Sequence, residues 1–516
     1  MSNKKYPVGI QSFSDIRKGG YFYIDKTDLI YKLVQTGKYY FLSRPRRFGK
    51  SLLISTLEAY FKGKKELFKR LAMESLEKEW IEYPVLHLDL NAEKFDTQHH
   101  LNTILLRHLN AWEDIWGADE REQTLSDRFY GIIRRAAEKT GKQVVILIDE
   151  YDKPLLQTIG NEELQDDFRG TLKAFYGVMK SSDRYIRFAL LTGVTKFSKV
   201  SVFSDLNNLE DISLQSDYQA LCGITHNELT SLLADEIKEL ANANGMTEEN
   251  AKNELKEWYD GYHFTAKGIG IYNPFSLLQV MKQKAFGNYW FETGTPTFLV
   301  ESLKKNRYPL ENLVGSMATS DILGGTDSAD ENPLPVLYQS GYLTIKGYYS
   351  EFKTFVLGFP NREVEDGFTR FILPYYASVQ KADSPSEIIR LVQEVRAGKV
   401  DSFMTRLQSF FADTPYELVR DLELHYQNVM FIVFKLLGFY TQAEYHTSKG
   451  RIDLLVKTDK YIYIMEFKLD GTAEQALQQI NEKNYSAPFA SDGRTIIKIG
   501  ANFSNESRSL EKWIME

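Results

Sequence analysis

The order of hydrophobic and polar positions divides the first part of the chain into alternating strand-like and helix-like segments. Four short apolar runs, rich in β-branched and aromatic residues, predict strands at residues 39–43, 84–90, 144–149 and 187–192. Segments with helical spacing lie between them. Strands that alternate with helices are typical of a mainly parallel sheet covered on both faces. The pattern therefore predicts an α/β domain over residues 1–222.

Beyond this domain the pattern changes several times. Residues 225–310 have mostly helical spacing, interrupted by a turn-rich stretch at 271–274. Residues 315–335 are rich in Gly, Ser and Asp, which indicates a loop or hinge. A hairpin is expected at 341–359, and helices from 363 to about 429.

The tail returns to an order of strand, turn, strand, helix and strand over residues 439–499. We therefore expect three parts after the first domain. They are a helical, lid-like or winged-helix-like region at 223–335, a connector of hairpin and helices at 336–415, and a second α/β domain at 416–516.

The stretch SRPRRFGKSL, residues 43–52, directly follows the first predicted strand and precedes a helical pattern. It corresponds to the phosphate-binding pattern G-x-x-x-x-G-K-[ST], with Arg44 in the place of the first glycine. In that pattern backbone N–H groups surround a polyphosphate, the lysine reaches the outer phosphates and the hydroxyl holds Mg²⁺. Arg44 takes a positive φ only at a cost, so a differently shaped loop with weak nucleotide binding is one alternative. The residues predicted to bind ATP here are Arg47, Phe48, Gly49, Lys50, Ser51 and Leu52, with Ser51 also a ligand of Mg²⁺.

A second signal is the apolar run at 144–148, which ends in Asp149 and Glu150. Paired with the lysine loop, two carboxylates at the carboxyl end of a buried strand favour nucleotide hydrolysis. Asp149 is predicted to hold Mg²⁺ and Glu150 to polarise the attacking water. Thr192, at the tip of another strand, is either a sensor of the γ-phosphate or a simple strand end. Asp152 is expected to cap a helix or form a salt bridge, and no arginine finger can be assigned.

A second chemistry is indicated by RIDLLVKTDKYIYIMEFK, residues 451–468. Two apolar strands flank a turn, and counting back from the turn places Asp453 roughly opposite Glu466. Glu466 and Lys468 leave the same face of their strand because they are two residues apart. Two converging carboxylates suit Mg²⁺, and the lysine can orient a water or offset phosphate charge. The alternative is a charged, solvent-facing hairpin.

The amino-acid composition excludes some classes of protein but does not by itself identify the function. The chain has 516 residues, too many for one core, with 43% hydrophobic and 26% charged residues. A net charge of −7 gives no general reason to expect nucleic acid or anionic membrane as a partner. A single cysteine, Cys222, excludes an intramolecular disulfide and a cysteine-based metal cluster. No apolar run is long enough for a signal peptide or a membrane span, so we expect a cytoplasmic protein with no membrane partner.

Collinear motifs over nearly all of the chain resemble a bacterial family. Its members join an N-terminal AAA-ATPase-like P-loop domain to a C-terminal, restriction-endonuclease-like domain of the PD-(D/E)XK nuclease superfamily. The motifs are YIDKT, SRPRRFGKS, ILIDEYD, LLTGVTKFS, WYDGYHF, YNPFSL, YWFETGTP, LGFPNREV, GRIDLLV and IMEFK. The resemblance implies phosphate and Mg²⁺ contacts for Lys50 and Ser51, and a hydrolytic role for Asp149 and Glu150. It also implies a nuclease centre, whose residues are Asp453, Glu466 and Lys468. YIDKT and WYDGYHF are expected to brace the domain rather than contact adenine.

The predicted nucleotide site and the predicted metal site in the tail together favour an ATP-dependent nuclease that acts on DNA in defence or mobile-element biology. One alternative is a regulatory nucleotide switch whose tail domain only binds nucleic acid or protein, because the chain is acidic and has no long basic stripe. Another is an ATPase motor without nuclease activity. DNA and RNA both stay open as partners, as does a homo-oligomer.

Overall fold

The computed structural model describes residues 4–91, 94–159, 161–196, 208–293, 297–325, 332–377, 380, 383–411, 422–438, 442–448 and 451–516. The side chains of residues 297, 298, 301, 422, 442–448 and 451–453 are outside the description. The chain forms two compact units. The first contains Met1–Gly294 and Gly315–Glu363, and the second contains Thr295–Val314 and Val364–Glu516. The four-part division expected above stays a prediction.

A five-stranded parallel sheet forms the centre of the first unit. Its strands lie in the order β2-β3-β4-β1-β5 and are parallel at every pairing. The four predicted strands are present, and β5 is an additional one. The bounds are β1 Tyr39–Ser43, β2 Val85–Asp89, β3 Val144–Asp149, β4 Ile186–Gly193 and β5 Glu210–Asp211. Every residue of β3 is buried, as its apolar run predicts for a central strand.

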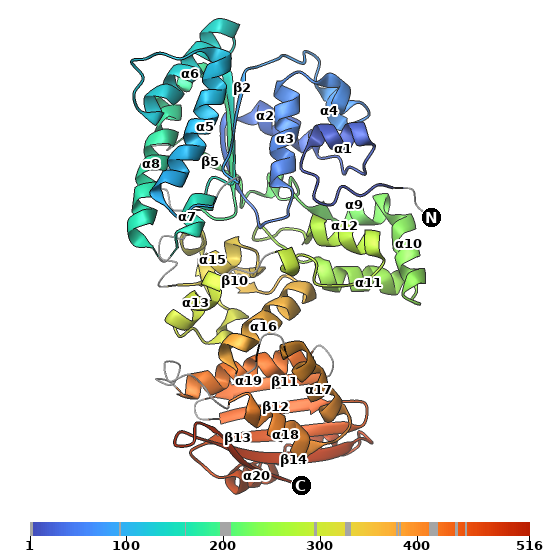
Figure 1. The fold of residues 1–516 in the computed structure, drawn as a ribbon. Helices are drawn as coiled ribbons and strands as arrows, with labels where there is room; N and C mark the ends of the chain where they lie inside the picture. Colours follow the sequence, from blue (N-terminus) through green and yellow to red (C-terminus); the bar gives the residue numbers. More distant parts are fainter. Residues whose placement is uncertain are drawn as a thin grey trace. The chain divides into compact units, whose positions relative to one another are not determined.

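Helices cover both faces of this sheet (Figure 1). One face carries α5 (Gln98–Trp116), α6 (Leu125–Thr140) and α8 (Glu162–Ser181), whose apolar sides form one core with the strands. The other face carries α3 (Lys50–Phe61), which follows β1, together with α2 (Thr27–Thr36). The remaining helices here are α1 Phe13–Gly19, α4 Ala72–Leu76 and α7 Lys153–Gln157.

The helical region after the sheet has its own core. It contains a two-stranded sheet of β6 and β7, and Asn273 caps α12 by accepting from the N–H groups of Phe275 and Ser276. This turn accounts for the break predicted at 271–274. The bounds are β6 Ile224–Thr225, α9 His226–Leu232, α10 Ala234–Ala243, α11 Glu248–Tyr259, β7 Ile271–Tyr272 and α12 Pro274–Gln283.

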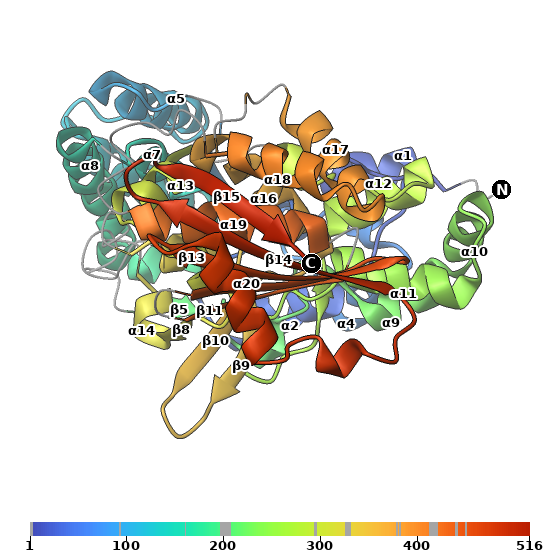
Figure 2. The ribbon, with the colours of Figure 1, turned by 90° about the horizontal axis from the view of Figure 1, so that it is seen from below.

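The stretch expected to be a loop at 315–335 is partly ordered. It contains β8 (Met317–Thr319), α14 (Ser320–Leu323) and the start of α15 (Leu334–Gln339), and residues 326–331 lie outside the described part. The predicted hairpin is present as β9 (Thr344–Tyr349) and β10 (Thr354–Gly358), drawn in tan in Figure 2. The loop prediction failed for the short elements because Gly and Ser composition does not reveal strand pairing with β10.

The second unit contains a five-stranded mixed sheet in the order β11-β12-β13-β14-β15. Only the β13–β14 pairing is parallel. The order from β12 to β14 is strand, turn, strand, helix, strand, as predicted for the tail, and β11 and β15 are additional strands. The bounds are α13 Thr297–Lys305, α16 Arg362–Tyr376, α17 Ser384–Arg396, α18 Val400–Ser409, α19 Leu422–Gly438, β11 Gln442–Ser448, β12 Arg451–Lys457, β13 Tyr461–Leu469, α20 Ala473–Glu482, β14 Thr495–Ser504 and β15 Ser509–Met515.

In the described part of the chain, no helix is both long and apolar enough to cross a membrane.

Candidate functional site

The loop between β1 and α3 is fixed by the side chain of Arg44. Its guanidinium donates to the carbonyl oxygens of Ser43 and Ser213 at 2.9 Å each and to that of Tyr218 at 3.3 Å. It also lies 3.9 Å from the ring centre of Phe264. Arg44 is only 1% exposed, and this burial lowers its pKa. Arg44, which replaces the first glycine of the pattern, therefore holds the loop in place by binding carbonyl oxygens of the domain.

The positive φ angles of the loop fall at other positions. Arg47 has φ 68° and Gly49 has φ 93°, whereas Arg44 is not among the residues with positive φ. The strain considered for Arg44 is thus absent. Gly49 precedes α3, and no side chain caps the first turn of that helix. A Cβ at Gly49 would meet nothing within 4 Å, so there is open space next to these helix N–H groups.

Lys50 is 3% exposed and lies at the centre of the site. Its Nζ donates to the carbonyl oxygen of Arg44 at 3.0 Å and that of Pro45 at 3.4 Å. The same Nζ lies 3.6 Å from Oε1 of Glu150. The lysine of the loop and the second carboxylate after β3 are therefore brought together, as the two sequence signals require.

Asp149 and Thr192 meet at the carboxyl ends of β3 and β4. The Thr192 hydroxyl donates to Oδ1 of Asp149 at 2.6 Å, and both residues are buried. Glu150 follows with φ 55°, a conformation that is uncommon for a residue with a Cβ. Thr192 is thus more than a strand end, because its hydroxyl holds the carboxylate predicted to bind Mg²⁺. Its role as a sensor stays a prediction.

Sequence reasoning did not foresee the role of Asp152. It stands at the N-cap position of α7, but its side chain makes no capping hydrogen bond and forms no salt bridge with the residues that the structure describes. Its carboxylate is fully buried and accepts from the backbone N–H groups of Val194 and Thr195, at 3.0 and 2.5 Å, and from the Thr195 hydroxyl at 2.7 Å. Burial, with the nearby charge of Glu150, raises the pKa of Asp152 to about 7. Asp152 therefore fixes the segment directly after Thr192.

The other predicted nucleotide-binding residues surround the start of α3. Arg47 is exposed, with its guanidinium 5.1 Å from the ring centre of Phe275. Phe48 is buried, with edge contacts to Tyr262 and Phe264. Tyr262 and Phe264 belong to WYDGYHF, so this motif braces the loop, as expected.

A small, largely apolar pocket of about 110 Å³ lies beside the start of α3. Its lining includes Gly49 and Leu52 from the start of α3, and Tyr23, Ile24 and Lys26 from the YIDKT motif. The remaining members of the YIDKT motif are structural: Asp25 accepts from the N–H of Thr27 at 2.9 Å and from that of Ala72 at 2.7 Å. The motif thus both braces the domain and lines a pocket, where bracing alone was expected.

In the second unit, β12 and β13 are paired in a register that places Asp453 directly opposite Glu466. Glu466 is fully buried, and its Oε1 accepts from Nζ of Lys468 at 3.1 Å. Lys468 also donates to Oε1 of Gln479 on α20. The side chain of Asp453 lies outside the described part, but its backbone position agrees with the register counted from the turn. Because Glu466 is buried, it does not belong to a solvent-facing charged hairpin.

Gln479 was not among the predicted site residues. A helix with several glutamines directly after the second strand was the only signal in the sequence, and helical spacing alone does not show which glutamine faces Lys468. Among the residues whose side chains are described, no three His, Cys, Asp or Glu form a group that could hold a metal ion.

Comparison with known proteins gives the same two parts. Residues 7–203 match the family described as Predicted AAA-ATPase, and residues 421–513 match the PD-(D/E)XK nuclease superfamily. The chain is 36% identical over 533 aligned positions to the "Uncharacterized protein in vnfD 5'region" of Azotobacter chroococcum mcd 1, with 100% of this chain and 99% of that protein covered. The structure of the Aeropyrum pernix ORC2 protein (ADPNP-ADP complexes) is 10% identical and matches 64% of this chain and 86% of that one, but its TM-score of 0.17 is too low to support an argument.

The chain therefore belongs to the family of predicted AAA-ATPases that carry a C-terminal domain of the PD-(D/E)XK nuclease superfamily. The fold class predicted from the sequence is confirmed. The first unit contains a P-loop domain with a parallel sheet, the region after it is largely helical, and the second unit contains the nuclease-like α/β domain.

Proposed function

We propose that the P-loop domain binds and hydrolyses ATP with Mg²⁺, and that its nucleotide state controls cleavage of a phosphodiester in nucleic acid by the second domain. The observation that carries the proposal is the convergence of Lys50, Glu150, Asp149 and Thr192 at one edge of the parallel sheet. This edge is where such folds bind ligands.

The arrangement fits a polyphosphate. The first turn of α3 is uncapped by a side chain, so its N–H groups and the positive end of the helix dipole are available to an anion. The ammonium of Lys50 now contacts only oxygen atoms in the contacts described above, and phosphate oxygens can replace the two carbonyl oxygens. Ser51, the second residue of α3, and Asp149 would hold Mg²⁺, which would neutralise charge on the phosphates.

The apolar pocket beside Leu52 supports a nucleotide rather than a free phosphate. It lies at the start of α3 and is largely apolar, as a site for a base would be. Tyr23, Ile24 and Lys26 would contact the base from the side of the YIDKT motif. Glu150, close to Lys50, would orient the attacking water, and Thr192 would keep Asp149 in place.

In the second domain, Asp453 and Glu466 would hold a Mg²⁺ ion. A fully buried carboxylate such as Glu466 needs a compensating positive charge, and Lys468 supplies one in the structure. The metal would activate water and stabilise phosphate charge, as in metal-dependent phosphodiesterases. Gln479 would orient Lys468 toward the phosphate. DNA is the proposed substrate class, and defence or mobile-element biology the proposed setting.

ATP hydrolysis is tested with Lys50→Ala and Glu150→Gln. Both should reduce the hydrolysis rate at least 100-fold. Glu150→Gln should still bind ATP, because this change removes the group that orients the attacking water and leaves the groups that contact the phosphates in place. Lys64→Ala is the matched control, since Lys64 is an exposed lysine shortly after the same helix. Full hydrolysis by Lys50→Ala would refute the proposed site.

Cleavage is tested with Mg²⁺ and ATP on single-stranded and double-stranded DNA and on RNA. Asp453→Asn should abolish cleavage, whereas Asp459→Asn, in the exposed turn of the same hairpin, should not. If wild type hydrolyses ATP but cuts none of these substrates and binds no Mg²⁺ or Mn²⁺ at the second domain, the regulatory switch is the better description. Sedimentation with and without ATP tests for a homo-oligomer.

A further inference from the structure

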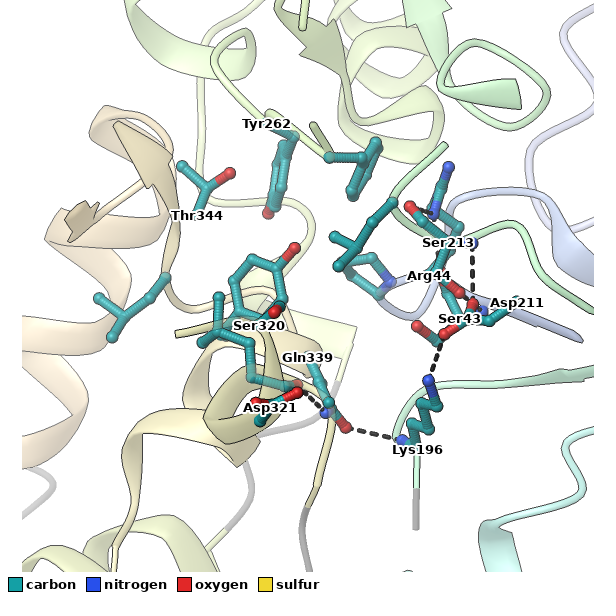
Figure 3. Close-up of a pocket in the computed structure, with 17 residues that line it drawn as sticks. Ser43, Arg44, Lys196, Asp211, Ser213, Tyr262, Ser320, Asp321, Gln339 and Thr344 are labelled. Carbon is teal, nitrogen blue, oxygen red and sulfur yellow. Dashed lines mark hydrogen bonds and ion pairs between the residues drawn. The ribbon is translucent and has the colours of Figure 1, made fainter. Parts of the chain in front are cut away.

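The larger of the two cavities described in the first unit lies outside the proposed ATP site. Its volume is about 410 Å³, within the range of small-molecule sites, and it lies on the side of the phosphate-binding loop formed by Ser43, Arg44 and Pro45. Figure 3 shows its walls converging from distant parts of the sequence, with Lys196, Gln339 and Asp321 along one side and Tyr262 and Thr344 on the other. Gly49, Lys50 and Leu52 do not line it. It is therefore separate from the proposed base pocket.

The walls are partly aromatic. Tyr262, Phe264 and Tyr338 line the cavity together with Pro45 and Leu343. Tyr262 and Phe264 belong to the WYDGYHF motif, which supports the phosphate-binding loop through contacts with Phe48 and through the contact of Phe264 with the Arg44 guanidinium. Aromatic and apolar walls with a few polar groups suit a flat ring system.

The cavity has no excess positive charge for a phosphate. The Arg44 guanidinium already donates to three carbonyl oxygens and lies against Phe264. Lys196 is paired with Asp211, which also lines the cavity. The two cations, Arg44 and Lys196, are balanced by the two carboxylates that line the cavity, and both cations already have partners other than a ligand. An uncharged ligand fits this balance better than a nucleotide does.

Asp321 contributes a carboxylate to the lining of the cavity. It is exposed at the start of α14, and the structure describes neither a hydrogen bond nor an ion pair to its carboxylate within the described part of the chain. A carboxylate has two acceptor oxygens in one plane and can accept two parallel N–H groups from one ligand edge. Ser320 also lines the cavity, whereas the Thr344 hydroxyl accepts from the N–H of His263 at 2.8 Å and donates to its carbonyl oxygen at 3.1 Å.

We propose that this cavity binds an uncharged planar heterocycle of nucleoside size that presents two adjacent N–H donors, as the edge of guanine does. The ring lies among Tyr262, Phe264 and Tyr338, and its paired N–H groups face Asp321. Because Asp321 is exposed, the ligand reaches the site without opening the core.

Ligand binding here is coupled to the loop, and this part of the inference rests on the proposed function. The cavity wall contains Arg44 and Pro45, whose carbonyl oxygens accept from Lys50. A ligand that stabilises this loop conformation changes the affinity for nucleotide at Lys50. By linkage the nucleotide changes the affinity for the ligand by the same factor.

The test uses full-length protein and guanosine as the probe, titrated calorimetrically in the presence of saturating ADP to occupy the nucleotide site. We expect guanosine to bind one site per chain, and inosine, which lacks the exocyclic amine, to bind about tenfold more weakly. Asp321→Asn should remove this preference. Asp235→Asn, which changes another exposed aspartate of the same unit, should leave it intact.

The outcomes separate the site from the coupling and from the proposed ATPase. No guanosine binding, or binding that is unchanged in Asp321→Asn, overturns the site. Guanosine binding that leaves the ADP affinity unaltered overturns the coupling. If the chain binds no ADP, the guanosine and inosine titrations are run without it, and the Asp321 variant still decides, because Asp321 does not line the base pocket.

Discussion

Asp152 offers a direct test of how the end of β4 is held. Its buried carboxylate accepts from two backbone N–H groups and one hydroxyl, all in the Val194–Thr195 segment that follows Thr192. Asp152→Ala removes the acceptor and leaves these donors, two of them buried on Thr195 and one partly buried on Val194, without that partner. Each such donor costs about 1–3 kcal/mol, so local stability should fall by roughly 3–5 kcal/mol, allowing for partial relaxation.

The same carboxylate predicts a pH dependence. Burial and Glu150 raise its pKa in the folded chain to about 7, from an ordinary value of 3.8. Between these values the folded state keeps a proton that the unfolded state has released. The resulting stabilisation is complete below pH 3.8 and is lost as the pH rises toward about 7. Three pKa units correspond to at most about 4 kcal/mol.

Asp152→Asn isolates this effect, because the amide has a similar shape but does not titrate. Hydrogen exchange of the backbone amides of β4 and of Thr195 should be followed in wild type and variant at several pH values from about 4 to 8. The free energy of opening in wild type, minus that in the variant, should decrease as the pH rises. A difference that stays constant over this range would refute the reasoning.

Three further predictions follow from individual contacts. Glu58 is paired with His87 at 3.1 Å, and this contact lowers the pKa of Glu58 to about 2 and raises that of His87. The pair therefore stabilises the fold from about pH 4.5 up to the raised pKa of His87. Glu58→Gln should cost about 1 kcal/mol in thermal unfolding near pH 6 but less near pH 9. Arg44→Ala should destabilise the P-loop domain by roughly 3 kcal/mol and weaken ADP binding in calorimetry, and Arg44→Lys should not restore either, since an ammonium cannot reach the same carbonyls in one plane. Gln479→Ala should slow DNA cleavage about tenfold while leaving ATP hydrolysis unchanged, and equal losses in both assays would argue against a role specific to Lys468.

Local sequence patterns predicted much of the first domain. The buried strand β3 is recognisable because its apolar residues form an unbroken run that ends in two carboxylates, and the loop after β1 because its lysine and glycine have fixed spacing. The opposition of Asp453 and Glu466 could also be predicted, since residue count from a tight turn determines register in a hairpin. These features depend on neighbours that are close in the chain.

Contacts between distant segments could not be predicted in this way. Whether the Arg44 side chain points to a phosphate or back into the domain depends on carbonyl groups of Ser213 and Tyr218, about 170 residues away. Asp152 was expected to cap a helix or form a salt bridge, but its partners are backbone N–H groups and a hydroxyl directly after β4. The two-residue strand β5 is too short for any periodicity and exists because it pairs with β1.

The contacts that hold Arg44, and with it the phosphate-binding loop, also affect when the site can fold during synthesis. The strand, loop and helix that contain Lys50 are complete once residue 61 has been made, but the groups that hold Arg44 come from Ser213, Tyr218 and Phe264. A nascent chain that stops short of Phe264 has every residue of the loop and lacks its support. Competence to bind nucleotide should therefore arise late, only when about half of the polypeptide has left the ribosome.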